Sequence, residues 1–266
     1  MKLPRAWRTG LREVPGSPGG ERQHAGAVSE SRPLLEVNML TAGYGGPTII
    51  ADVCLTARTG HLTAIVGPNG AGKSTLIKAI AGIVKPTSGT VRLNGEDVTG
   101  SPPQNLARRG MSYIPQVANV FPSLTVQENL EMGGYVLRGG IREKIEELYE
   151  TFPDLRDARR RQARTLSGGQ RSMLAIGRGL MSNPAILLLD EPTAGLAPRF
   201  LETVWEQIAT IRTLGVAVIV VEQNTRRTLA YADWAYVLVA GKNQLEGAGT
   251  DLLEDDEVEK LYIGKV

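Results

Sequence analysis

The chain has 266 residues, of which 42% are hydrophobic and 22% are charged, and its formal net charge is +2. This is the composition of a soluble globular protein of one large domain or two small ones, and its even charge balance gives no support for a nucleic-acid binder, which needs a basic face. The single cysteine, Cys54, excludes a disulfide within the chain, and two histidines cannot by themselves form a zinc site.

Apolar runs in the sequence are too short to cross a bilayer. The run at 216–221 has the length of a buried strand, whereas a spanning helix needs about 20 apolar residues. If the protein acts at a membrane, we expect it to dock onto a partner that spans it.

The first 32 residues differ in composition from the rest. They are rich in proline, glycine, arginine and glutamate and show no hydrophobic periodicity, which predicts a disordered extension. Trp7 and the scattered arginines leave open a targeting or docking arm. We expect the folded domain to occupy residues 33–266.

From residue 34 onward, short apolar runs alternate with helical patterns. The predicted strands lie at 62–66, 90–93, 111–114, 185–190 and 216–221, and the predicted helices at 72–81, 125–138, 141–151, 167–180 and 198–214. Such alternation predicts an α/β fold, with a mostly parallel sheet covered by helices on both faces. The charged stretch from about 117 to 165 lacks strand character and is interpreted as a helical insertion.

A glycine-rich loop precedes the predicted helix at 72–81. Residues 67–75, Gly-Pro-Asn-Gly-Ala-Gly-Lys-Ser-Thr, fit the pattern G-x-x-x-x-G-K-[ST] between a strand and a helix, a context that argues against a turn without a ligand. Glycines let backbone N–H groups approach phosphates, and a helix N-terminus adds partial positive charge. Lys73 supplies a full charge to the β- and γ-phosphates of ATP, and the Ser74 hydroxyl is placed to ligate Mg²⁺. The predicted binding residues are Gly67, Asn69, Gly70, Gly72, Lys73, Ser74 and Thr75.

Two acids end the predicted strand at 185–190. Asp190 and Glu191 follow a run of apolar residues, which suits a strand beside the one that leads into the glycine-rich loop. In that position Asp190 holds Mg²⁺ through water, and Glu191 polarises the attacking water as general base. A solvated acidic turn is the alternative, and the neighbouring phosphate loop argues against it.

The segment Leu166-Ser167-Gly168-Gly169-Gln170 matches the LSGGQ signature of ABC ATPases, just before a predicted helix as in that family. With the two motifs above, the chain resembles this family over residues 34–266. The resemblance implies a P-loop NTPase core with a helical subdomain, at about 117–165, and a small antiparallel β subdomain. It also implies that the signature of one subunit clamps ATP on the phosphate loop of another, so that dimerisation completes the site.

Two further residues match family positions. Tyr44, in Gly43-Tyr44-Gly45, corresponds to the aromatic residue that stacks on adenine. Gln116 corresponds to the glutamine that contacts Mg²⁺ and the attacking water, and it begins the helical insertion. A half-buried turn tyrosine and a surface glutamine are the structural alternatives.

Two departures from the family pattern bear on activity. Ala197 stands where most members have aspartate, and Gln223 stands where most have a histidine that contacts the γ-phosphate. A glutamine can donate a hydrogen bond but cannot carry a proton or a charge. We therefore expect a catalytic role for Gln223 in a site that works but is slowed, partnered by a more typical second subunit.

The same two departures point to a resemblance with one subfamily. The segments GLAP and VEQN, with Glu128 to Tyr135 and the ends LEG and YIG, resemble the second ATPase subunit of branched-chain amino-acid importers. Urea and short-chain amide importers have similar ATPases, and exporter or lipopolysaccharide-transport ATPases, soluble ABC ATPases and a non-catalytic regulatory cassette are more distant alternatives.

The resemblance also implies partners and a location. These are membrane-spanning permease subunits, a second ABC ATPase subunit that is either identical or a sister, and an extracytoplasmic substrate-binding protein that acts indirectly, with no nucleic acid. The position is peripheral, on the cytoplasmic face of the inner membrane. The arginine-rich run at 156–164 is either a solvated helical face or a contact to the membrane subunit or to anionic headgroups.

Overall fold

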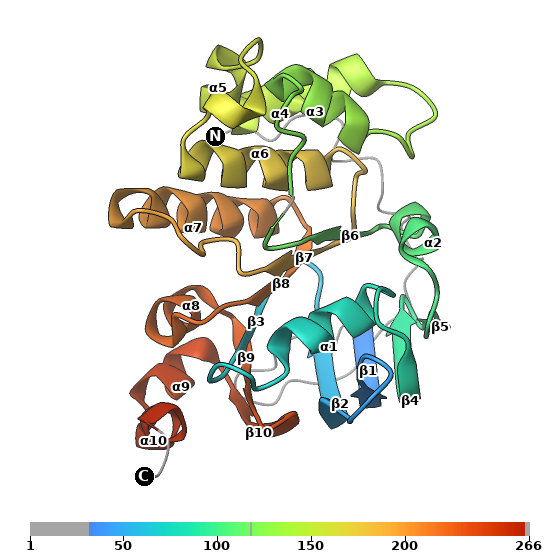
Figure 1. The fold of residues 1–266 in the computed structure, drawn as a ribbon, viewed down its shortest axis with the longest axis vertical. Helices are drawn as coiled ribbons and strands as arrows, with labels where there is room; N and C mark the ends of the chain where they lie inside the picture. Colours follow the sequence, from blue (N-terminus) through green and yellow to red (C-terminus); the bar gives the residue numbers. More distant parts are fainter. Residues whose placement is uncertain (1–31, 118, 264–266) are drawn as a thin grey trace, which may run out of the picture. The chain divides into compact units, whose positions relative to one another are not determined.

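Two β-sheets organise the part of the chain that the computed structural model describes, residues 32–117 and 119–263. In the larger sheet the strands lie in the order β10-β9-β3-β8-β7-β6 (Figure 1), and each neighbouring pair is parallel except β9 and β10. The bounds are Leu62–Val66 (β3), Met111–Ile114 (β6), Ile186–Asp190 (β7), Ala217–Val221 (β8), Trp234–Val239 (β9) and Lys242–Gly247 (β10). The expected mostly parallel sheet is thereby confirmed.

The central strands of this sheet are buried on both faces. Every residue of β3, β7 and β8 is buried, which explains their continuous apolar sequences. On one face, Leu188 and Ile219 join a core with α1 (Lys73–Ile80). Because side chains alternate along a strand, the residues between them point to the opposite face. Figure 1 shows α6 (Gly168–Leu180) and α7 (Pro198–Thr213) on that side.

The smaller sheet is antiparallel, as expected for the β subdomain, with the strand order β2-β1-β4-β5. Its strands are β1 (Leu35–Ala42), β2 (Ile50–Ala57), β4 (Pro86–Leu93) and β5 (Glu96–Asp97). Strand β2 of this sheet is joined to the larger sheet by the Asn243 side chain on β10. The amide oxygen of Asn243 accepts from the Cys54 N–H at 2.9 Å, and its amide nitrogen donates to the Cys54 carbonyl at 3.0 Å. One side chain thus makes the two hydrogen bonds to the Cys54 backbone that a residue of a neighbouring strand would make.

The described residues of the predicted insertion form short helices beside α6 (Figure 1). They are α3 (Val126–Gly133), α4 (Ile141–Thr151), α5 (Pro153–Asp157) and a 3₁₀ turn (Ala163–Thr165). The helix predicted at 125–138 is wrong at its C-terminal end, because α3 stops at Gly133. Two consecutive glycines are poor helix formers, and a Cβ on Gly133 would collide with the Arg178 carbonyl on α6. Close packing of α3 on α6 therefore requires glycine where the helix ends.

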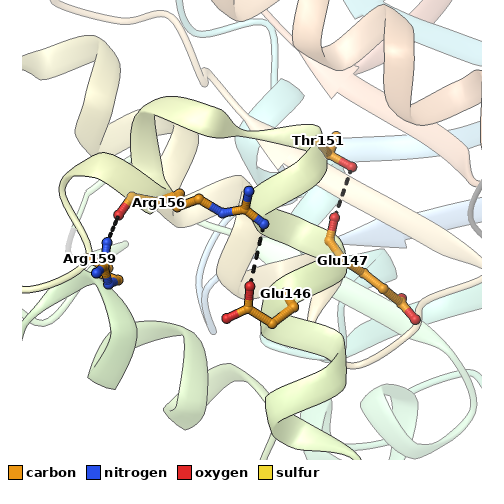
Figure 2. Close-up of polar contacts among 5 residues, drawn as sticks. All are labelled: Glu146, Glu147, Thr151, Arg156 and Arg159. Carbon is orange, nitrogen blue, oxygen red and sulfur yellow. Dashed lines mark hydrogen bonds and ion pairs between the residues drawn. The ribbon is translucent and has the colours of Figure 1, made fainter. Parts of the chain in front are cut away.

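Figure 2 shows how part of the arginine-rich run is held at the α4–α5 corner. Arg156 pairs with Glu146 at 3.4 Å, and Arg159 donates to the Arg156 carbonyl at 3.3 Å. On α4 the Thr151 hydroxyl donates back to the Glu147 carbonyl at 3.4 Å. Arg156 and Arg159 thus make local contacts at an exposed corner, where an ion pair contributes little to stability.

The remaining helices are short. They are α2 (Pro103–Arg108), α8 (Thr225–Tyr231), α9 (Gly249–Glu254) and α10 (Asp256–Ile263). Across residues 32–117 and 119–263, no helix is long and apolar enough to cross a membrane. The predicted disordered extension falls, up to residue 31, outside the described residues.

Candidate active site

The glycine-rich loop turns directly into α1 at the end of β3. Gly70 and Gly72 have φ angles of 77° and 95°, in the left-handed region that favours glycine. A Cβ on Gly72 would also lie 2.7 Å from the Ile50 side chain, so glycine is required there twice over. Gly72 caps α1, and no side chain occupies the free N–H groups of the first turn. The loop therefore presents backbone donors at a helix N-terminus, the arrangement that binds phosphate groups.

Lys73 is folded back over this loop. Its ammonium group donates to the carbonyls of Gly67 at 2.7 Å and Pro68 at 3.0 Å, and the side chain is buried. Burial lowers the pKa of Lys73, while the nearby carboxylates of Glu191, Asp190 and Glu222 raise it. Hydrogen bonds between two ionised groups are stronger than those to neutral carbonyls, so a phosphate is a better partner for this ammonium group than the loop carbonyls.

Ser74 and Asp190 meet at the edge of the sheet. The Ser74 hydroxyl donates to one oxygen of Asp190 at 3.1 Å, and the Tyr113 hydroxyl donates to the other at 3.1 Å. Burial raises the pKa of Asp190, and these two hydrogen bonds oppose that rise. Hydroxyl and carboxylate oxygens are the ligands that Mg²⁺ prefers, completed by phosphate and water. This pair therefore fits a magnesium site.

Glu191 lies beside them and is held by two glutamines. Gln223 Nε2 donates to its two carboxylate oxygens at 2.9 and 2.8 Å, and Gln116 Nε2 donates to Oε2 at 2.8 Å. The Glu191 backbone has a φ of 49°, which is uncommon for a residue with a Cβ. Such strain persists where the surroundings hold it, and it is frequent at functional sites.

These groups surround a cavity of about 360 Å³. Its walls come from Ile49, residues 69–75, Glu191 and Gln223. The predicted site residues that line this cavity are Asn69, Gly70, Gly72, Lys73, Ser74, Thr75, Glu191 and Gln223. Gly67, Gln116 and Asp190 connect to them by hydrogen bonds. The cavity combines donors for anions with a carboxylate positioned to accept a proton.

The signature segment does not line this cavity. Ser167 caps α6, with its hydroxyl oxygen accepting from the Gln170 N–H at 3.2 Å and the Gln170 side chain accepting from the Ser167 N–H at 3.1 Å. The Ser167 hydroxyl hydrogen stays available to a ligand. Gly168 and Gly169 pack against Leu196 and Phe200, where added side chains would be crowded. Its predicted role in trans remains a prediction.

Tyr44 lies in the turn between β1 and β2 with its side chain 60% exposed. Tyr44 is more exposed than the half-buried turn tyrosine considered as the alternative, and it is not among the residues that line the cavity. Its role in adenine stacking remains a prediction.

Two polar residues of this region were not predicted from the sequence. Tyr113 donates to Asp190, and Glu222 accepts from Thr193 behind Glu191. Burial raises the pKa of Glu222, and the bonds from Thr193 and Gln223 oppose the rise. A signal existed for Glu222, because it directly follows an apolar predicted strand, whereas Tyr113 lies inside its short strand and left none.

Comparison with known proteins shows similarity over most of the chain. Residues 50–194 match the family model described as ABC transporter. The chain is 42% identical over 235 residues to a probable branched-chain amino acid transport ATP-binding protein, LivF, of Archaeoglobus fulgidus, covering 88% of this chain and 100% of that protein. It is 38% identical to the high-affinity branched-chain amino acid transport ATP-binding protein BraG of Pseudomonas aeruginosa, covering 87% and 100% of the two.

Other relatives are similar over a comparable length. The lipopolysaccharide export system ATP-binding protein LptB of Haemophilus influenzae is 35% identical, with 87% of this chain and 98% of that protein covered. Among solved structures, the ADP conformation of an ATP-binding cassette of an ABC transporter superposes with a TM-score of 0.78 at 29% identity, covering 88% of this chain and 100% of that one. The chain therefore belongs to the ABC transporter family, as an ATP-binding subunit whose hydrolysis of ATP is coupled to transport.

Proposed function

We propose that this subunit powers an importer of branched-chain amino acids by hydrolysing MgATP in the cavity beside Lys73. The observation that carries the ATPase part is the convergence of a phosphate loop, a buried carboxylate on β7 and an amide-held Glu191 on one cavity. The chemistry is positioning and charge neutralisation, with little covalent work for the protein.

The side chains of the cavity divide the reaction among them. Lys73 exchanges the carbonyls of Gly67 and Pro68 for the β- and γ-phosphates. Glu191 accepts the proton of the attacking water, and the amides of Gln116 and Gln223 hold its carboxylate in place. ADP and phosphate then leave, and Lys73 returns to the loop carbonyls.

Magnesium fits this proposal through Ser74 and Asp190. When bound there, Mg²⁺ neutralises charge on the β- and γ-phosphates. Ser74 would act through its hydroxyl, Asp190 through water, and Gln116 through its amide oxygen, since only its amide nitrogen is bonded to Glu191.

A second ATPase subunit completes the site in this account. The N-terminus of α6 offers the Ser167 hydroxyl and the Gly168 and Gly169 amides outside the chain's own cavity. We propose that they meet ATP on the phosphate loop of the other subunit, either a copy or a sister. ATP binding then draws the two cassettes together.

A mostly apolar groove of about 530 Å³ supports docking onto a permease subunit. It lies among α2, β6, α3 and α6, and the exposed side chains of Met132 and Tyr135 are on its wall. The Arg178 guanidinium stands 5.0 Å above the Phe121 ring in the same wall. The chain runs from β6, in the wall of this groove, to Gln116, which bonds to Glu191. A short permease helix docked in the groove would therefore be connected to the active site through this segment. The subunit then works peripherally on the cytoplasmic face of the membrane, and an external binding protein acts only through the permease.

The substrate assignment is supported by the two branched-chain amino-acid relatives and by Ala197 and Gln223, which match that subfamily. Import of urea or short amides is the alternative within the same class. The similarity to LptB favours an exporter as the second candidate function.

Affinity capture of this chain from detergent-solubilised membranes, followed by mass spectrometry and an uptake assay with labelled leucine and urea, tests the assignment. We expect two related permeases, a second ATPase and leucine uptake that depends on this chain. Recovery of a lipopolysaccharide-export complex, or urea uptake alone, would overturn the substrate. Recovery of ribosomal or DNA-repair proteins with no permease would overturn transport.

A further inference from the structure

Glu222 is a buried carboxylate that the reaction steps above do not use. Its side chain is 3% exposed and lies directly after β8. Oε1 accepts from the Thr193 N–H at 3.0 Å and from the Thr193 hydroxyl at 2.7 Å, and Oε2 accepts from the Gln223 N–H at 3.3 Å. A buried carboxylate costs free energy unless it is hydrogen-bonded, and these donors offset that cost.

The bonds of Glu222 hold the turn that carries Glu191. Val221 and Glu222 are consecutive, and each fixes one end of the turn: the Val221 carbonyl accepts from the Glu191 N–H at 2.9 Å, and Glu222 accepts from Thr193. Between these two anchors the Glu191 backbone has its strained φ of 49°. Without the second anchor the turn loses one of its supports, and a shift of the turn moves the carboxylate of Glu191.

The same turn is tied to the signature helix. The Ser172 hydroxyl on α6 donates to the Pro192 carbonyl at 3.1 Å. A chain of contacts therefore runs from Gln223 through Glu222 and Thr193 to α6.

We propose that Glu222 is a positioning residue, which clamps the 191–193 turn through Thr193 so that Glu191 faces the attacking water. The inference rests on the proposed role of Glu191 as general base. Glu222 does not line the cavity beside Lys73. Its contribution is to keep the carboxylate of Glu191 in place.

The test compares Thr193→Val with Thr193→Ser in the full-length chain purified with its membrane subunits. Valine keeps the shape and the backbone N–H but removes the hydroxyl donor to Glu222, whereas serine keeps both donors. We expect Thr193→Val to lower kcat about fivefold to tenfold with KM for MgATP within about twofold, since the hydrogen bond it removes is to a charged group. Thr193→Ser is expected to keep the kcat of the wild type.

Glu222→Leu and Glu222→Gln complete a double-mutant cycle with Thr193→Val. The glutamine keeps an acceptor for Thr193, so we expect it to retain more activity than the leucine, and we expect Thr193→Val to add little to Glu222→Leu. Wild-type kcat in Thr193→Val, or an equal loss in Thr193→Ser, would overturn the clamp. So would a loss of nucleotide binding or thermal stability that accounts for the whole decrease, because that is a merely structural effect.

The failure of this inference is distinguishable from failure of the proposed function. If Glu191→Gln retains turnover, the assignment of Glu191 as general base is wrong, and the positioning role of Glu222 is wrong with it. If Glu191→Gln abolishes turnover while Thr193→Val is unchanged, only the clamp is wrong.

Discussion

Replacing Gln223 by alanine removes one of the two amides that hold Glu191. Its nitrogen lies 2.9 and 2.8 Å from the two carboxylate oxygens, and the Gln116 amide at 2.8 Å remains. The general base therefore loses part of its support but keeps an anchor. We expect Gln223→Ala to slow hydrolysis without abolishing it.

The magnitude follows from the hydrogen bonds lost. A hydrogen bond to a charged group contributes about 1.5–3 kcal/mol. Gln223 is exposed, so water partly replaces it and the lower end applies. A loss of about 1.5 kcal/mol in the transition state corresponds to about a tenfold decrease in kcat. KM is expected to change less, because the phosphate loop is untouched.

Steady-state release of phosphate by the purified complex measures this effect. Gln127→Ala is a matched control, because among the described residues the Gln127 side chain bonds to Glu131 on the surface of α3 and to no group of the cavity, and we expect wild-type turnover. Gln223→His should raise turnover above the wild type if the glutamine slows the site, since imidazole can carry a proton. Wild-type kcat in both Gln223 variants would refute a special role for this position.

Three other predictions concern binding, turnover and stability. Lys73→Ala should abolish MgATP-dependent turnover, and phosphate release above background would contradict the role of its ammonium group. Tyr44→Ala should weaken nucleotide binding about fivefold, the low end of a stacking contribution of about 1–3 kcal/mol, while Tyr44→Phe should bind as the wild type; equal dissociation constants by fluorescence titration would exclude stacking. Burial lowers the pKa of Lys144, with Glu147 opposing, so at high pH the unfolded state binds more protons and wild-type stability rises as pH passes the folded pKa. The melting temperature of the wild type should therefore rise relative to that of Lys144→Met as the pH is raised from about 8 to about 10. A difference between the two that stays constant would contradict this.

The phosphate loop and the acidic strand end could be predicted because their chemistry depends on local spacing. Glycines before Lys73, and acids after an apolar run, leave signals within a few residues. Gln116 and Gln223 were predicted from the family resemblance, but their hydrogen bonds to Glu191 were not. Gln116 and Gln223 reach it only because β6, β7 and β8 are neighbours whose carboxyl ends meet at one edge.

The helix end that was predicted wrongly depends on tertiary packing. Helix α3 ends at Gly133 because α6 approaches there, which the periodicity of 125–138 did not indicate. The position of Glu222 after an apolar strand was a signal, but its partner was not, since its carboxylate accepts from Thr193 on a different turn of the chain. Strand order and close approach, rather than local pattern, decide such contacts.

Nucleotide binding and turnover in Glu191→Gln test the central claim most directly. The purified complex would be loaded with labelled MgATP, and bound nucleotide and released phosphate would be measured for the variant and the wild type. We predict that the variant binds ATP as tightly as the wild type but releases almost no phosphate, with ATP trapped in a closed dimer. Full turnover in the variant, or no ATP binding by the wild type, would contradict the account.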